Sequence, residues 1–497
     1  MLFNSYIFIF VFLPITLLVF FGLARFRLTK VAVVWLTITS FYFYGYWSIP
    51  YLALMLISVV FNHQMGRAID RAIDNVDPKT NQAKTLLWIG IIVNLLIISY
   101  YKYANFFISS LNSVLSTTIT SPEIILPLGI SFYTFTQIAY LVDAYRGETK
   151  GYKYDLLTYS LFVTFFPQLV AGPILRHDEL ILQFRQLRSF VFSHKNMALG
   201  LTMFSLGLSK KVLIADNLSS WVAPVFNNAE AVSFIEAWVG ALSYTFQLYF
   251  DFSGYSDMAI GLGLMFNIRL PINFDSPYKA ISITDFWRRW HITLSNFLRD
   301  YLYIPLGGSR RGELRRYINL LLTMLLGGLW HGAGWTYVIW GGLHGIYLSI
   351  NHWWRKLNIP LPKLLAWSVT FIAVVVGWVL FRAKTLPDGM EILQAMVGMK
   401  GIVIPGEAQG KLAVLTKFGL QLQSWKDFVY LPEVNGSKFL SMVVLVGLTL
   451  CATLLPNTQQ ILQKLKPTWW WAAWVGVLAS FCLLSLNRVS EFLYFQF

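Results

Sequence analysis

Uncharged apolar runs that approach the thickness of a lipid bilayer recur along the whole chain, for example over residues 6–23, 86–101 and 365–381. A helix needs about 20 apolar residues to cross the hydrocarbon core. Only 13% of the 497 residues are charged, whereas soluble domains have about 25%. The pattern therefore predicts an all-α polytopic membrane protein, since the short alternating segments of a membrane β-barrel do not occur.

The net charge of +15 fits this class, because Lys and Arg collect in cytoplasmic loops. With the N-terminus outside, the basic clusters within residues 25–30, 67–84 and 146–153 all fall on the cytoplasmic side. The charge therefore needs no nucleic-acid partner to explain it. We expect a single domain, residues 1–497, with about eleven transmembrane helices.

Two apolar stretches do not fit a simple succession of spans that cross the membrane outward and inward in turn. Residues 156–175 are followed by basic residues that would otherwise lie on the wrong side, and Pro167, Gly172 and Pro173 break the stretch. Such a segment can enter and return if the surrounding protein satisfies its backbone. Residues 317–350 form two short apolar pieces joined by HGAG, and basic residues follow them as well. Both stretches are predicted to be re-entrant.

Residues 269–316 form an amphipathic block with nine Lys or Arg and four Asp or Glu. This is the largest basic block of the chain, so we expect it to be helical and cytoplasmic. Within it, helical spacing would place Trp287, His291 and Leu294 on one face. Because His291 follows Arg288 and Arg289, it could face an anionic donor such as a coenzyme phosphate; the alternative is an interfacial helix with snorkelling arginines.

The uncharged stretch LLGGLWHGAGWTYVIWGGLHG, residues 325–345, holds His331 among seven glycines. Ionisable groups within a membrane protein are costly and are functional candidates for that reason. A neutral imidazole between Trp330 and Trp335 could take a proton from a hydroxyl. The alternative is a histidine that is simply hydrogen-bonded in the core. We interpret His331 as catalytic and His344 as packing or support.

The sequence offers no metal site, since Cys451 and Cys482 lie in apolar segments without ligand spacing. We also expect Asp257, in FDFSGYSD, to face a pocket or the interface. The predicted catalytic residues are His331 and His291, and the predicted substrate-binding residues are Arg288, Arg289, Trp290, Trp330 and Asp257.

Several longer motifs are similar to those of one known family. They are NSYIFIFVFLP, VAGPILR, FDFSGYSDMAIGLGLMFNIRLPINFDSPY, DFWRRWHITLSNFLRDYLYIPLGGSRRG, LWHGAGWTYVIWGGLHG and FLYFQF, in that order along the chain. The sequence resembles the membrane-bound O-acyltransferase (MBOAT) family, and within it the membrane subunits of bacterial alginate O-acetyltransferases. The resemblance assigns the essential histidine of the WHG element to His331 and a second histidine to His291.

This resemblance implies an enzyme of the cell inner membrane whose helices enclose a tunnel. An acetyl group would pass from a cytoplasmic donor, acetyl-CoA, to an exopolysaccharide such as alginate, with no bound cofactor. It implies membrane lipid as a partner, together with a periplasmic or membrane-anchored acetyltransferase. Cellulose or peptidoglycan stay open as acceptors, and His331 could be a base or a transient acyl carrier. A transporter without covalent chemistry is the rival hypothesis, although no internal repeat favours it.

Within this scheme we expect His291 to serve the donor at the cytoplasmic side and His331 to serve transfer deeper in the bundle. A group beside two guanidinium groups suits phosphate contact, and a buried neutral group suits proton transfer.

Overall fold

The computed structural model describes residues 1–75, 81–149, 154–406, 420–466, 468–486 and 493. The described chain is overwhelmingly helical, and its only named strands are β1 (Val403–Pro405) and β2 (Gln421–Gln423), which pair in parallel. The predicted all-α class is therefore confirmed. The segment between residues 382 and 438 contains the helix α18 (Leu386–Met396).

Five helical stretches among the described residues are long and apolar enough to cross a membrane. They are Phe8–Arg25, Ile49–Asp74, Asn81–Leu115, His194–Asn227 and Lys363–Arg382. Two shorter apolar helices, α19 (Lys438–Leu454) and α21 (Trp469–Leu484), follow near the C-terminus. These helices support a multi-pass membrane protein, and the number of about eleven spans stays a prediction.

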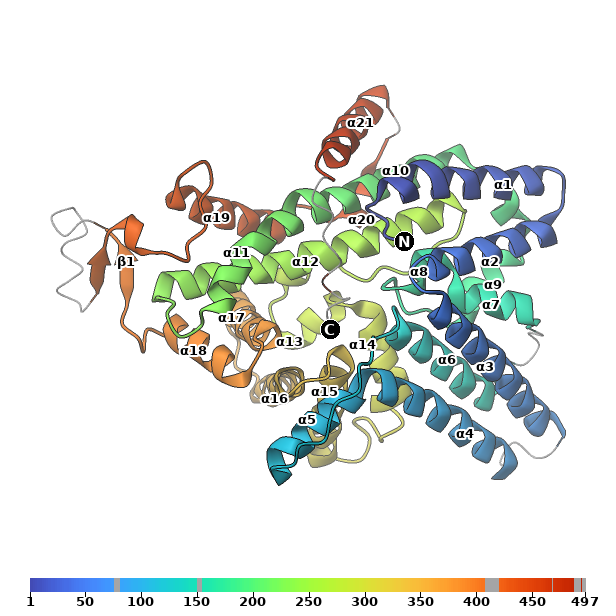
Figure 1. Cartoon of the computed structure of the whole chain (residues 1–497), viewed down its shortest axis with the longest axis horizontal. Helices are drawn as coiled ribbons and strands as arrows, with labels where there is room; N and C mark the ends of the chain where they lie inside the picture. The colour runs from blue at the N-terminus through green and yellow to red at the C-terminus, as the bar shows by residue number, and fades with distance from the viewer. Residues whose placement is uncertain (76–80, 150–153, 407–419, 467, 487–492, 494–497) are drawn as a thin grey trace.

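The long helix α12 (Phe234–Met265) runs through the middle of the molecule, with α10 (His194–Ser209) and α11 (Asp216–Asn227) alongside it (Figure 1). The N-terminal helices gather at the right of Figure 1: α1 (Leu13–Arg25), α2 (Thr29–Gly45), α3 (Ile49–Asn75), α4 (Asn81–Ile98) and α6 (Ile130–Tyr145). Below α12 in the same view lie α15 (Glu313–His331), α16 (Trp335–Leu357) and α17 (Lys363–Arg382). Of these three helices, α17 packs directly on α12.

Two pairs of glycines allow α10 and α12 to approach closely. A Cβ on Gly207 would lie 2.5 Å from the carbonyl oxygen of Gly254, and a Cβ on Gly261 would lie 2.7 Å from that of Gly200. Small residues at such crossings let helix backbones touch, which matters where lipid removes the hydrophobic drive for association. Two ion pairs extend the contact: a partly buried one from Lys210 Nζ to Asp257 Oδ2 at 2.6 Å, and a buried one from Lys211 Nζ to Asp251 Oδ1 at 2.7 Å.

The stretch 156–175 is broken, as its prolines and glycine predict. Helix α7 (Leu156–Thr164) ends at Phe165, the short helix α8 (Phe166–Leu169) follows, and irregular backbone continues to Arg176. All residues from 159 to 175 are buried. Protein therefore covers the irregular backbone, which is the condition for a re-entrant segment; its placement relative to the membrane stays a prediction.

The expected hairpin around HGAG is also present, since α15 and α16 pack along each other with a sharp turn at residues 332–334. The amphipathic block differs from expectation. Helix α13 (Ile283–Arg289) ends before Trp290, and α14 (Ile292–Leu298) begins after His291, whose φ is +43°. The prediction that Trp287, His291 and Leu294 share one helical face is therefore wrong.

The break between α13 and α14 has a local cause. Asp275 N donates to Arg289 O at 2.9 Å, and Ile292 N donates to Asn273 O at 3.0 Å. The extended segment near Asn273 thus takes hydrogen bonds that a continuous helix would make internally. Because buried backbone groups need partners, this pairing stabilises the interruption.

Replacing Gly207 with Ala tests the close crossing of α10 and α12. The new methyl group would meet backbone atoms of Gly254 and Met258, which cannot move aside as a flexible side chain can. We expect Gly207→Ala to cost about 1–3 kcal/mol and to lower the melting temperature in detergent. Gly447→Ala in α19 is the control, since no atom lies within 4 Å of its added methyl. Equal melting temperatures for both variants would contradict the packing described here.

Candidate active site

His331 ends α15 in an aromatic box. Its side chain is only 5% exposed, and its ring centroid lies 5.0 Å from that of Trp330, 5.2 Å from Trp340 and 5.4 Å from Phe381. Helices α15, α16 and α17 each supply one wall. The predicted apolar surroundings of His331 are thus present, although Trp335 is 59% exposed and lies outside the box.

His291 lies in the same buried region as His331. Its residue is 0% exposed, and the two imidazole centroids are 6.4 Å apart. We call these two residues the histidine pair. The break after α13 turns His291 into the interior, beside His331, and the expected depth of each histidine in the membrane stays a prediction. Both imidazoles can therefore act on one reacting centre.

Asn273 determines which nitrogen of His291 carries a proton. Its Oδ1 lies 3.3 Å from Thr293 N, and a backbone N–H can only donate, so this atom is the amide oxygen. The same oxygen lies 3.1 Å from His291 Nδ1. Since an amide oxygen only accepts, Nδ1 must carry a hydrogen, and a neutral His291 keeps its lone pair on Nε2. His291 is therefore oriented as a proton acceptor.

The C-terminal end of α15 is capped from a distant helical stretch. Lys102 Nζ donates to Trp330 O at 2.6 Å and to His331 O at 3.1 Å, and Tyr103 Oη donates to Leu329 O at 2.8 Å. These carbonyls have no partners within the helix, and a cation is favourable at this pole of the helix dipole. The cap fixes the backbone of the WHG element.

His344 lies one turn after Trp340, and its ring centroid is 4.8 Å from the Trp340 ring. Trp287 Nε1 donates to His344 Nδ1 at 3.2 Å. Because indole is only a donor, a neutral His344 carries its proton on Nε2, which faces Gly377 of α17. The structure thus connects His344 to the walls of the aromatic box, and its supporting role stays a prediction.

Among the predicted binding residues, Trp330 borders the histidine pair and stacks on Phe135 at 5.2 Å. Trp290 lies in the neighbouring aromatic core, 4.8 Å from Trp378. Two others have structural partners. Arg289 Nε donates to Asp285 Oδ1 at 2.8 Å, and Asp257 Oδ2 accepts from Lys210 and from Thr458. These contacts favour structural roles for Arg289 and Asp257.

Two cavities flank α14 close to His291. The first, of about 350 Å³, is lined by Trp287, Arg288, Ile292, Asn296, Arg299, Met324 and His352, among others. The second, of about 220 Å³, shares Ile292, Asn296 and Arg299 and adds Arg176, Thr293 and Tyr301. Arg288 is exposed, so its guanidinium group is available to an incoming anion. Among the described residues, no cluster of His, Cys, Asp or Glu could hold a metal ion.

Lys102, Tyr103 and Asn273 are not among the residues predicted from the sequence. A signal existed for Lys102, which is a single charge in the aromatic run YYKYANFF within an apolar stretch. Asn273 gives no such signal, because its contact with His291 depends on the unpredicted break between α13 and α14.

Comparison with known proteins places these features in one family. Residues 146–385 match the model described as "MBOAT, membrane-bound O-acyltransferase family". A peptidoglycan O-acetyltransferase of Helicobacter pylori is 41% identical over 100% of this chain and 98% of its own length. The protein named "Probable alginate O-acetylase AlgI" of Pseudomonas aeruginosa is 45% identical over 80% of this chain and 75% of its own length.

A more distant relative, a teichoic acid D-alanyltransferase of Streptococcus thermophilus, is 29% identical over 51% of this chain and 68% of its own length. The residues that match the family model, 146–385, include the histidine pair, the aromatic box and, apart from Ala139, all the residues that line the two cavities beside α14. This chain is an acyltransferase that belongs to the membrane-bound O-acyltransferase family.

Proposed function

We propose that this enzyme O-acetylates a polysaccharide of the bacterial cell envelope, with acetyl-CoA as the cytoplasmic donor, and that it resides in the inner membrane. The observation that carries the proposal is the histidine pair, buried 6.4 Å apart between aromatic walls. A neutral imidazole in such a site can move a proton without the large cost of burying a permanent charge. The two relatives named for O-acetylation support acetyl as the transferred group.

In the proposed reaction, the oxygen of an acceptor hydroxyl attacks the thioester carbonyl. His331 takes the hydroxyl proton, the new C–O bond forms and the C–S bond breaks. The proton then passes from His331 to the leaving thiolate, so that the imidazole is neutral again. The lone pair on His291 Nε2 would stabilise the transient charge on His331, directly or through one water molecule. Transient acetylation of His331 is the alternative route.

The donor would approach through the cavity beside Arg288. The exposed guanidinium group of Arg288 suits the phosphates of coenzyme A, since charge-assisted contacts to phosphate are strong. The apolar part of the same lining, Trp287 and Met324, would accompany the thioester arm toward the aromatic box. A partner acetyltransferase outside the cytoplasm would receive the acetyl group or present the polymer.

Alginate and peptidoglycan are the two acceptors that the relatives favour. The alginate O-acetylase named above is 45% identical, whereas the peptidoglycan enzyme matches along 100% of this chain. Purified protein with acetyl-labelled CoA and either polymer, supplied as oligosaccharides, would separate these possibilities. If the label stays on acetyl-CoA and reaches neither polymer, water nor the protein itself, the acetyltransferase proposal is contradicted and the transporter is favoured.

Replacing His331 with Ala removes the proposed base. We expect acetyl transfer to fall by about 10²–10⁴-fold, the usual contribution of general acid–base catalysis. Protein levels in the membrane should stay near normal, because Trp330, Trp340 and Phe381 still form the box. The measurement is polymer acetylation in cells together with the amount of folded protein. A well-expressed His331→Ala variant with wild-type acetylation would show that another residue is the base.

Variants at Asn273 test the orientation of His291. Asn273→Asp keeps an acceptor for Nδ1–H and adds a negative charge, which favours the protonated imidazole. We therefore expect substantial activity whose acidic limb moves to higher pH. Asn273→Leu lacks the acceptor and should lower kcat by about 10–100-fold, with little change in KM for the donor. If both variants lose equal activity with an unshifted pH profile, Asn273 has only a structural role.

Arg288→Ala tests the donor cavity. Loss of one charge-assisted phosphate contact should raise KM for acetyl-CoA by about tenfold, since such a contact contributes about 1.5 kcal/mol. A short acetyl thioester without phosphates, such as acetyl-N-acetylcysteamine, is the control substrate and should be used equally well by both enzymes. Equal losses with the two donors would place Arg288 outside the phosphate site.

A further inference from the structure

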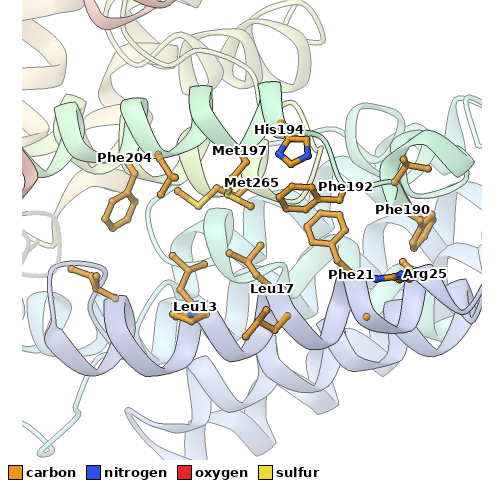
Figure 2. Close-up of a pocket in the computed structure, with 17 residues that line it drawn as sticks. Leu13, Leu17, Phe21, Arg25, Phe190, Phe192, His194, Met197, Phe204 and Met265 are labelled. Atoms are coloured by element: carbon orange, nitrogen blue, oxygen red, sulfur yellow. The ribbon is translucent and has the colours of Figure 1, made fainter. Parts of the chain in front are cut away.

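A large groove lies between α1 and α10, in the part of the molecule built by the N-terminal helices (Figures 1 and 2). Its volume is about 1060 Å³, and most of its lining is apolar. The side chains labelled in Figure 2 include Leu13, Leu17, Phe21, Phe190, Phe192, Met197, Phe204 and Met265. This surface matches hydrocarbon chains in size and chemistry.

One end of the groove carries the positive charge of Arg25. Arg25, the last residue of α1, and His194, the first residue of α10, lie at this same end in Figure 2, and both are exposed. No ion pair between described residues involves Arg25. The groove therefore has one charged end and a long apolar body.

A polar cavity of about 410 Å³ adjoins the groove, because both are lined by Val191 and Phe192. Arg188 and Arg269 line this cavity together with Gln183, Gln186, Ser189, Ser193, Asn196 and Asn267. Both arginines are exposed, and neither forms an ion pair with a described residue. Neither lining contains Asp or Glu. The combined site thus favours an amphiphile with a negatively charged, hydrogen-bonding head.

We propose that this combined site binds an anionic diacyl phospholipid, such as phosphatidylglycerol. Its acyl chains lie in the groove between α1 and α10, and its phosphate contacts Arg25, Arg188 and the neighbouring polar cavity. A free phosphate would leave the apolar body of the groove without a contact. An apolar helix of a partner protein would leave the polar cavity without a contact. The basic residues also belong to segments predicted to be cytoplasmic, where anionic lipid attracts Lys and Arg.

The test measures which lipids stay bound to the purified protein. Wild type is exchanged into mixed micelles with equal amounts of phosphatidylglycerol and phosphatidylcholine of the same chain length, and retained lipid is quantified by mass spectrometry. We expect enrichment of phosphatidylglycerol, which falls by about fivefold for each of Arg25→Ala and Arg188→Ala. Arg310→Ala, in an exposed loop, is the charge-matched control and should keep the enrichment.

A second variant tests the apolar part. Leu17→Trp fills the groove and should reduce retention of both lipids without changing their ratio. Equal retention of the two lipids by wild type would overturn the proposal. So would displacement by inorganic phosphate alone, or a Leu17→Trp variant that retains lipid normally but loses a co-purifying protein.

Discussion

The site depends on one polar junction in an otherwise apolar interior, the side chain of Asn273. Its Oδ1 accepts from His291 Nδ1, and it also accepts from the backbone N and the hydroxyl of Thr293. The Thr293 hydroxyl in turn accepts from Ile174 N at 3.0 Å. Three irregular stretches therefore meet there: the broken segment after α8, the extended strand-like segment after α12, and the break before α14. Irregular backbone is stable in such surroundings only when its polar groups are paired.

This junction explains how distant segments form one centre. The break before α14 turns His291 toward α15, whose last residue is His331. Lys102 and Tyr103 hold the carbonyls at that end, and the aromatic side chains of α16 and α17 close the box. The proximity of the two imidazoles supports our proposal that the histidine pair, rather than His331 alone, carries the chemical role.

Much of this organisation follows from sequence. Long apolar runs predict the spans, prolines and glycine predict the broken segment, and the HGAG element predicts the hairpin that carries His331. The glycine pairs of α10 and α12 also leave a signal, since Gly200 and Gly207 are seven residues apart, as are Gly254 and Gly261. The break at His291 leaves no signal in the sequence. WRRWHITL contains neither proline nor glycine, and a histidine with positive φ is uncommon. It exists because tertiary hydrogen bonds to the Asn273 segment replace helical ones, and such bonds cannot be derived from local periodicity.

The central claim is that the histidine pair acts on one reacting centre, and a double-mutant cycle tests it most directly. The rate of acetyl transfer from acetyl-CoA is measured for His291→Ala, for His331→Ala and for the double variant, each at saturating donor. Residues that act as a unit give strongly non-additive effects. We predict that the double variant is about as slow as the slower single variant. Single effects that multiply in the double variant would contradict the account, because they would mean that His291 and His331 contribute to the rate independently of each other.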